Sequence, residues 1–158
     1  MKRIIIYIIV LAALLLAPVK GADIGRLRPV ETVFIYHLND QVVIETDTSD
    51  WGMGSDSAAA LENLKDTTPG TIYLDTAEYL LIGEDAQEAA QQLRPVLKKS
   101  VRLCVAEQGI DLTAAAAFLS GKGELTRLKD WNPGDNLPHL KAYQGRLILI
   151  ESTRKRNL

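Results

Sequence analysis

The amino-acid sequence predicts an α+β (mixed α/β) domain: a small mixed β-sheet with an amino-terminal hairpin and three or four helices packed on it, preceded by a signal helix. Short apolar runs with strand-like alternation recur between turn signals, and segments with helical spacing separate these runs. The chain beyond the leader is long enough for one hydrophobic core. We therefore expect one domain over 22–151, followed by a basic disordered tail over 152–158.

The leader has the features of a secretory signal peptide over residues 1–21. Two basic residues precede an uncharged apolar run, 4–17, and small residues follow it. As a helix this run would span about 21 Å, less than the roughly 30 Å of a hydrocarbon core. We expect cleavage between Gly21 and Ala22, with an uncleaved anchor as the alternative. Either way, the leader contacts the membrane during export and the domain is extracytoplasmic, secreted or membrane-associated.

The first element expected in the domain is a β-hairpin over 31–46. Apolar residues alternate over 32–37 and again over 41–46. Between these runs, Asn39 and Asp40 tolerate the positive φ of a tight turn.

A helix and two strands are expected next. The polar, glycine-bearing segment 47–57 is interpreted as a loop that ends in helix-capping residues, and apolar positions from Ala58 share one helix face until Pro69 ends the element. Residues 71–74 indicate a strand. The brief apolar run 79–82 is short enough for a strand that is buried on both faces.

The second half of the chain repeats these signals. Asp85 is expected to cap a helix that Pro95 bends or divides, and Asp111 to cap an alanine-rich helix over 112–120. A further amphipathic turn or two is expected around Leu125 and Leu128. Strands are expected over 101–105 and 147–150, the second of which closes the sheet.

Charge and cysteine content limit the function classes. The chain holds 18 Lys and Arg against 20 Asp and Glu, a formal charge of −2, which argues against nucleic acid as a partner. Cys104 is the only cysteine, so no intramolecular disulfide can form. It lies in an apolar stretch, and we expect it to be buried and inert.

No pattern typical of a cofactor, metal or nucleophile site is present. His37 and His139 lie far apart in the sequence, so they form no His/Cys cluster. The sequence also lacks a G-x-S-x-G nucleophile turn and the spacing of a phosphate-binding loop. We expect neither a cofactor nor a metal.

The polar segment around Trp51 is the most suggestive one. Glu45, Asp47, Asp50 and Asp56 surround it, and they could hold calcium or act as acid and base, although their spacing is not that of an EF-hand loop. A solvated acidic loop explains them equally well. The tryptophans next to glycine-containing loops are interpreted either as core plugs, that is, buried side chains that fill the edge of the core, or as side chains that dock a partner. The candidate interaction surface consists of Asp50, Trp51 and Trp131.

A family resemblance rests on three motifs. A helix begins Ala58-Ala59-Ala60-Leu61, the strand Thr71-Ile72-Tyr73-Leu74 follows, and then comes Glu78-Tyr79-Leu80-Leu81-Ile82-Gly83-Glu84. This order, over about 31–130, resembles the amino-terminal domain of Ger(x)C-type spore germination proteins. The resemblance implies an exported mixed α/β domain, associated with a membrane receptor complex of a spore-forming bacterium, and no enzyme activity. No functional residue is carried over from the family.

The sequence leads us to expect a noncatalytic extracytoplasmic accessory or interaction module, associated with spore germination, whose partner is a membrane or envelope protein complex. Two alternatives stay open. One is a small secreted hydrolase that uses the carboxylates near Asp50. The other is a small-ligand carrier whose pocket lies between the loops at Trp51 and Trp131.

Overall fold

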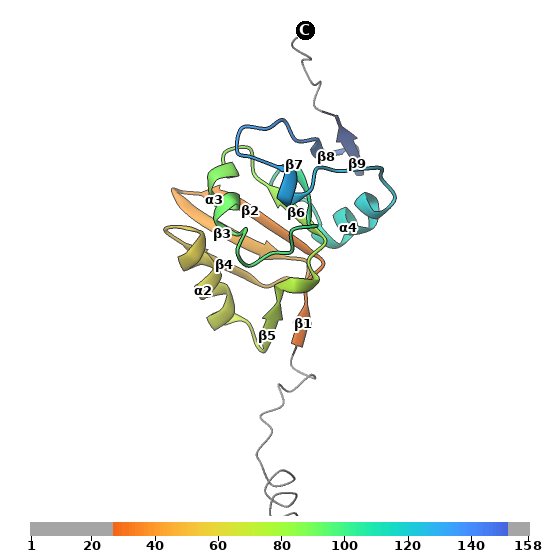
Figure 1. Ribbon diagram of the computed structural model, residues 1–158. Coiled ribbons are helices and arrows are strands. Elements are labelled where there is room, and N and C mark those ends of the chain that lie inside the picture. Colours follow the sequence, from red (N-terminus) through yellow and green to blue (C-terminus); the bar gives the residue numbers. More distant parts are fainter. Residues whose placement is uncertain (1–26, 152–158) are drawn as a thin grey trace, which may run out of the picture.

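A computed structural model describes residues 27–151 of the chain (Figure 1). The predicted leader, its cleavage site at Gly21 and Ala22, and the predicted tail lie outside these residues. The described strands are β1 (Leu27–Pro29), β2 (Thr32–Leu38), β3 (Gln41–Thr46), β4 (Trp51–Gly54), β5 (Thr71–Tyr73), β6 (Tyr79–Ile82), β7 (Arg102–Ala106), β8 (His139–Tyr143) and β9 (Arg146–Ile150). The described helices are α2 (Ser57–Thr67), α3 (Gln87–Gln92) and α4 (Leu112–Ser120), with the 3₁₀ turns η2 (Leu74–Thr76) and η3 (Leu128–Asp130).

Seven strands form one mixed sheet in the order β4-β3-β2-β6-β7-β8-β9. Neighbouring strands from β2 to β8 run parallel, whereas β3 and β4 at one end and β9 at the other are antiparallel to their neighbours. Outside this sheet, β1 and β5 form a short parallel pair. The predicted mixed α+β fold is confirmed, including the hairpin of β2 and β3.

Alternation along the central strands divides the core into two clusters, one on each face of the sheet. Val33 and Ile35 of β2 belong to the cluster that also holds residues of α2 and α3. Phe34, between them, belongs to the cluster that holds residues of α4. Both neighbours of β6 are strands, and all four of its residues are buried, as predicted for a strand with two covered faces. Three layers result, with α2 and α3 on one face and α4 on the other.

Two glycines allow α2 to pack directly on β4. A Cβ at Gly52 would lie 2.3 Å from the carbonyl oxygen of Ala60 and from the backbone nitrogen of Leu64, and a Cβ at Gly54 would lie 2.5 Å from the Ala60 nitrogen. Only glycine permits an approach this close. Because side chains alternate along a strand, the residues beside these glycines, Trp51 and Met53, point to the opposite face.

The helix caps follow the predictions in two of three cases. Asp56 accepts a hydrogen bond from the Ala59 N–H at the start of α2, and Asp111 accepts one from the Ala114 N–H at the start of α4. The predicted cap at Asp85 is wrong, because α3 begins after Ala86 with no side-chain cap. The long helix expected around Pro95 is also shorter than predicted. It ends at Gln92, three residues before the proline whose missing N–H interrupts a helix, and the chain continues in turns.

Other differences concern short segments that gain their structure from neighbours. The segment 47–57, interpreted as a loop, contains β4, which pairs with β3 and lies under α2. Residues 139–143, for which no element was expected, form β8, which pairs with β7 and β9. Of the amphipathic stretch expected around Leu125 and Leu128, only the 3₁₀ turn η3 at Leu128–Asp130 is helical.

Candidate interaction surfaces

The three aspartates around Trp51 each bind a structural partner. Asp50 receives hydrogen bonds at both oxygens, one of 2.9 Å from the Arg28 guanidinium to Oδ1 and one of 2.7 Å from the Thr48 hydroxyl to Oδ2. The Asp47 carboxylate accepts a hydrogen bond from the Glu31 N–H at 3.2 Å. Together with the cap made by Asp56, these contacts fix the loop and the start of α2, and they do not direct the three aspartates toward a common point.

Glu45 is a partly buried carboxylate of this segment. It lies on β3 directly opposite Trp51 of β4, on the face of the sheet away from α2. Burial raises the pKa of Glu45 above its ordinary value, because a partly desolvated carboxylate resists ionisation. The pKa of Tyr36 is raised by burial and, to a smaller extent, by the charge of Glu45. A single carboxyl group with a raised pKa does not make an acid–base pair, because such a pair needs a second carboxylate beside it.

Trp51 and Trp131 lie in opposite environments. The side chain of Trp51 is 57% exposed, whereas Trp131 is 0% exposed and belongs to the core cluster under α2 and α3. The Arg94 guanidinium lies 5.5 Å from the Trp131 ring and donates a hydrogen bond to its carbonyl oxygen. The prediction of a core plug is therefore confirmed for Trp131 and wrong for Trp51. Trp131 cannot share an exposed surface with Asp50 and Trp51.

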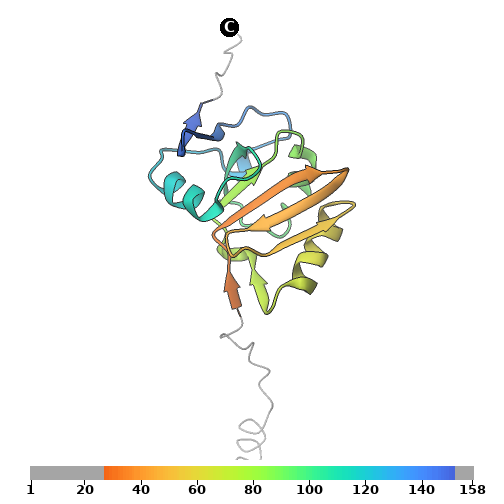
Figure 2. The same cartoon turned by 180° about the vertical axis from the view of Figure 1, so that it is seen from behind.

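The exposed side of Trp51 belongs to an uncovered face of the sheet. In Figure 2 the orange to yellow strands β2, β3 and β4 face the viewer, and no helix passes in front of them. The helix on this side, α4, contacts β2. Trp51, Met53 and Glu45 consequently present a mixed aromatic, apolar and acidic surface beyond the area that α4 covers. This surface, defined by these three residues, is the Trp51 face.

The outer edge of β4 is occupied by polar side chains of α2. The Thr46 N–H donates to the Asp50 carbonyl, so Asp50 directs its backbone groups toward β3. Backbone groups alternate in direction along a strand, so Gly52 and Gly54 also face β3. The N–H and C=O groups of Trp51 and Met53 therefore point outward, away from β3. The Met53 N–H donates to Asn63 Oδ1 at 3.0 Å. The Thr67 hydroxyl, which donates to the Asn63 carbonyl of its own helix at 2.8 Å, also lies 3.4 Å from the Trp51 carbonyl oxygen. The helix thus binds the Met53 N–H and covers the Trp51 C=O, groups that an edge strand normally leaves open.

The opposite edge of the sheet, β9, lacks such a cover. Gln144 and Gly145 both have positive φ and form a two-residue turn, so Tyr143 and Arg146 are the hydrogen-bonded pair next to it. Alternation then directs the N–H and C=O groups of Leu147 and Leu149 away from β8. Within residues 27–151, no other segment makes a hydrogen bond to these outward groups. In Figures 1 and 2 this hairpin stands at the end of the molecule far from α2.

Two histidines and two carboxylates that are distant in sequence meet where the parallel strands β2, β6 and β7 end. His37 Nδ1 lies 3.6 Å from Asp85 Oδ2, and His139 Nδ1 lies 3.9 Å from Glu84 Oε1. Neither histidine taken alone indicates this edge. A signal in the sequence is that Glu84 and Asp85 follow the buried strand β6 after a single glycine. Among the described residues, no group of three or more His, Cys, Asp and Glu side chains is arranged to hold a metal ion.

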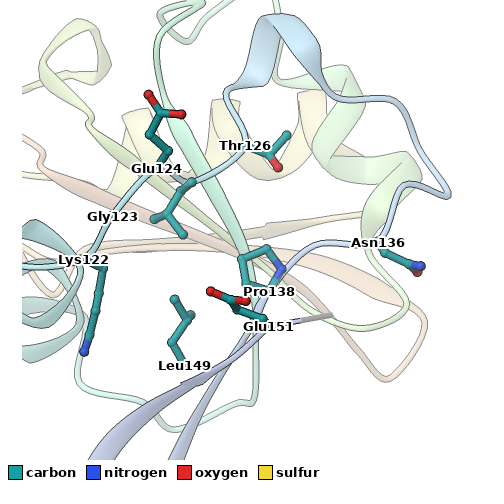
Figure 3. A pocket seen from close by; sticks show the side chains of 9 residues that line it. Lys122, Gly123, Glu124, Thr126, Asn136, Pro138, Leu149 and Glu151 are labelled. Atoms are coloured by element: carbon teal, nitrogen blue, oxygen red, sulfur yellow. The ribbon is translucent and has the colours of Figure 1, made fainter. Parts of the chain in front are cut away.

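Two hollows bear on the small-ligand hypothesis. One of about 580 Å³ opens between the loop after α4 and the β8–β9 hairpin, and Figure 3 shows it lined by Lys122, Gly123, Glu124, Leu125, Thr126, Asn136, Pro138, Leu149 and Glu151. A smaller one of about 190 Å³ lies beside Asp50 and Trp51. Trp131 lines neither hollow, so neither of them is the pocket expected between the two tryptophans.

Cys104 has the environment that the sequence predicts. It is buried in the cluster that includes α4. Burial raises the pKa of the thiol to about 12, because the thiolate would lack solvation. The thiol form therefore persists at neutral pH, and this cysteine is not a nucleophile.

The chain matches no protein-family model, no curated protein and no solved structure. Within residues 27–151, no helix has the length and apolar character needed to cross a membrane.

Proposed function

We propose that the protein is a noncatalytic extracytoplasmic accessory module that binds a membrane or envelope protein complex through the Trp51 face. The observation that carries this proposal is the 57% exposure of a tryptophan on a part of the sheet face that α4 does not reach and that no other helix within residues 27–151 covers. Tryptophan provides a large contact area at low cost in conformational entropy, and it is enriched among the residues that dominate binding energy at protein interfaces.

The surroundings of Trp51 support a rigid docking surface rather than a catalytic one. Arg28 and Thr48 hold Asp50, and Thr67 and Asn63 hold the backbone of β4, so the surface is ordered before a partner arrives. A preorganised surface loses less entropy on binding. The same contacts occupy the carboxylates that a hydrolase would need, which favours the interaction module over that alternative.

The export signal and the family resemblance give the proposal its cellular setting. The apolar leader supports delivery across the membrane. The resemblance to Ger(x)C-type spore germination proteins supports an association with a germinant receptor complex in a spore-forming bacterium. The partner we propose is therefore a protein of that membrane complex.

The test is affinity purification of the full chain from the envelope fraction of its host. Wild type is expected to retain a stable partner, and Trp51→Ala to lose it by at least about tenfold, the loss typical of a central aromatic contact. Tyr73→Ala is the matched control, because Tyr73 is an exposed aromatic residue on β5, outside the seven-stranded sheet. Equal recovery of the partner with Trp51→Ala and wild type would contradict the proposal.

A further inference from the structure

The β9 strand presents a second surface, which the proposed function does not use. Its outward backbone groups, on Leu147 and Leu149, are unpaired within the described residues. An unpaired edge is a template for another strand, and proteins normally block it with a helix, a charge or a bulge. Asn63 and Thr67 do this for β4, but the described part of the chain makes no comparable contact at β9.

Apolar side chains accompany these open groups. Ile148 and Ile150 are 38% and 47% exposed and project from one face of β9, beside the exposed ring of Tyr143 on β8. Leu147 and Leu149 project from the other face and pack against the cluster that holds α4 residues. The strand is therefore anchored to the core on one face and exposes a row of isoleucines on the other.

We propose that β9 pairs with β9 of a second copy of this chain, antiparallel and about a twofold axis at Leu149, so that two seven-stranded sheets become continuous. The pattern of β9 is self-complementary about this residue, because an isoleucine lies on each side of it. Leu149 then exchanges its hydrogen bonds with Leu149 of the second copy. Leu147 does the same with Glu151 of the second copy.

This register also matches side chains on the exposed face. Ile148 lies opposite Ile150 of the second copy, and the two form an apolar cross-strand pair there. An axis at Ile148 would instead place Arg146 against Ile150 of the second copy. Self-complementarity is what a twofold interface requires, and it favours a second copy over an unrelated partner.

Disulfide trapping in the full chain tests both the pairing and its register. Ile148→Cys and Ile150→Cys are prepared separately, oxidised alone and as a mixture, and examined on a nonreducing gel. The mixture is expected to give a band of twice the monomer mass, because residues 148 and 150 face each other across the axis. Each variant alone is expected to give none. Wild type controls for Cys104, which is buried.

A second measurement keeps the proposal testable if the cysteine variants fold poorly. Sedimentation of the full chain in detergent is expected to give a dimer for wild type and a monomer for Ile148→Lys/Ile150→Lys, since lysines would then oppose each other across the axis. Leu38→Lys is the matched control, because Leu38 is 43% exposed on β2 and lies away from β9. A wild-type monomer at every concentration, or a cross-link formed by Ile148→Cys alone, would overturn the proposal.

Discussion

The two edge strands of the sheet, β4 and β9, differ in what covers them. Both are short, both are antiparallel to their neighbours, and both direct two residues' backbone groups outward. At β4, a helix lies close enough for Asn63 to bind the Met53 N–H and for Thr67 to cover the Trp51 C=O. At β9, no helix or loop in the described part of the chain binds them.

Whether a helix covers an edge strand depends on whether the residues of that strand leave room for the helix to pack. Gly52 and Gly54 lack the Cβ atoms that would push α2 away, and α2 therefore packs on β4. The inward positions of β9 are Leu147 and Leu149, which fill the space beneath the strand themselves. A protected edge leaves only the Trp51 face of β4 available to a partner, while an open edge makes the backbone of β9 available too.

The largest effect on this comparison is expected from Gly52→Val. The new side chain would overlap the backbone of Ala60 and Leu64, so α2 must move away from β4, at a cost of about 3 kcal/mol in the free energy of unfolding. Urea unfolding followed by circular dichroism measures it. Gly123→Ala is the control, because its Cβ would meet nothing within 4 Å and should change stability little. Unchanged stability of Gly52→Val would show that α2 does not pack on β4 as described.

A smaller effect is expected from Asn63→Ala, which removes the acceptor for the Met53 N–H and uncovers part of the β4 edge. The free energy of unfolding should fall by about 1 kcal/mol, the usual contribution of one hydrogen bond. Asn63→Asp retains the acceptor oxygen and should stay closer to wild type. If the alanine and aspartate variants lose the same stability, the contact to Met53 is not what stabilises this edge.

The smallest effect is expected from Glu45→Gln on the Trp51 face. Burial raises the pKa of Glu45 in the folded state, so protonation favours folding, and this contribution is lost as pH rises through the raised pKa. At neutral pH the variant should be more stable than wild type, by less than about 1 kcal/mol because water still reaches the carboxylate. The difference should shrink as pH falls. Urea unfolding across that pH range measures it, and a difference independent of pH would contradict it.

Much of the fold could be predicted because local signals and tertiary structure agree. The hairpin of β2 and β3 alternates clearly, and the caps at Asp56 and Asp111 depend only on nearby N–H groups. In contrast, β4 has the composition of a turn and becomes a strand only because α2 and β3 border it. No periodicity marks β8, whose conformation depends on pairing with distant residues.

The candidate site could be predicted only in part. Asp50 and Trp51 were recognised as an unusual segment, but their roles depend on Arg28, more than twenty residues away, and on the glycine beside Trp51 that turns its ring outward. Trp131 has a similar local sequence and lies in the core, because burial is decided by what packs around a side chain. The open edge of β9 has no local signal, since it follows from the order of strands in the sheet.

Amide hydrogen exchange at Met53 and Leu149, measured by NMR over a range of protein concentrations, tests the contrast between the two edges most directly. The Met53 amide, which bonds to Asn63 of its own chain, should be protected equally at every concentration. The Leu149 amide should exchange quickly in dilute protein and become protected as the concentration rises. Rapid exchange of Leu149 at every concentration, or an unprotected Met53, would contradict the account of one covered and one open edge.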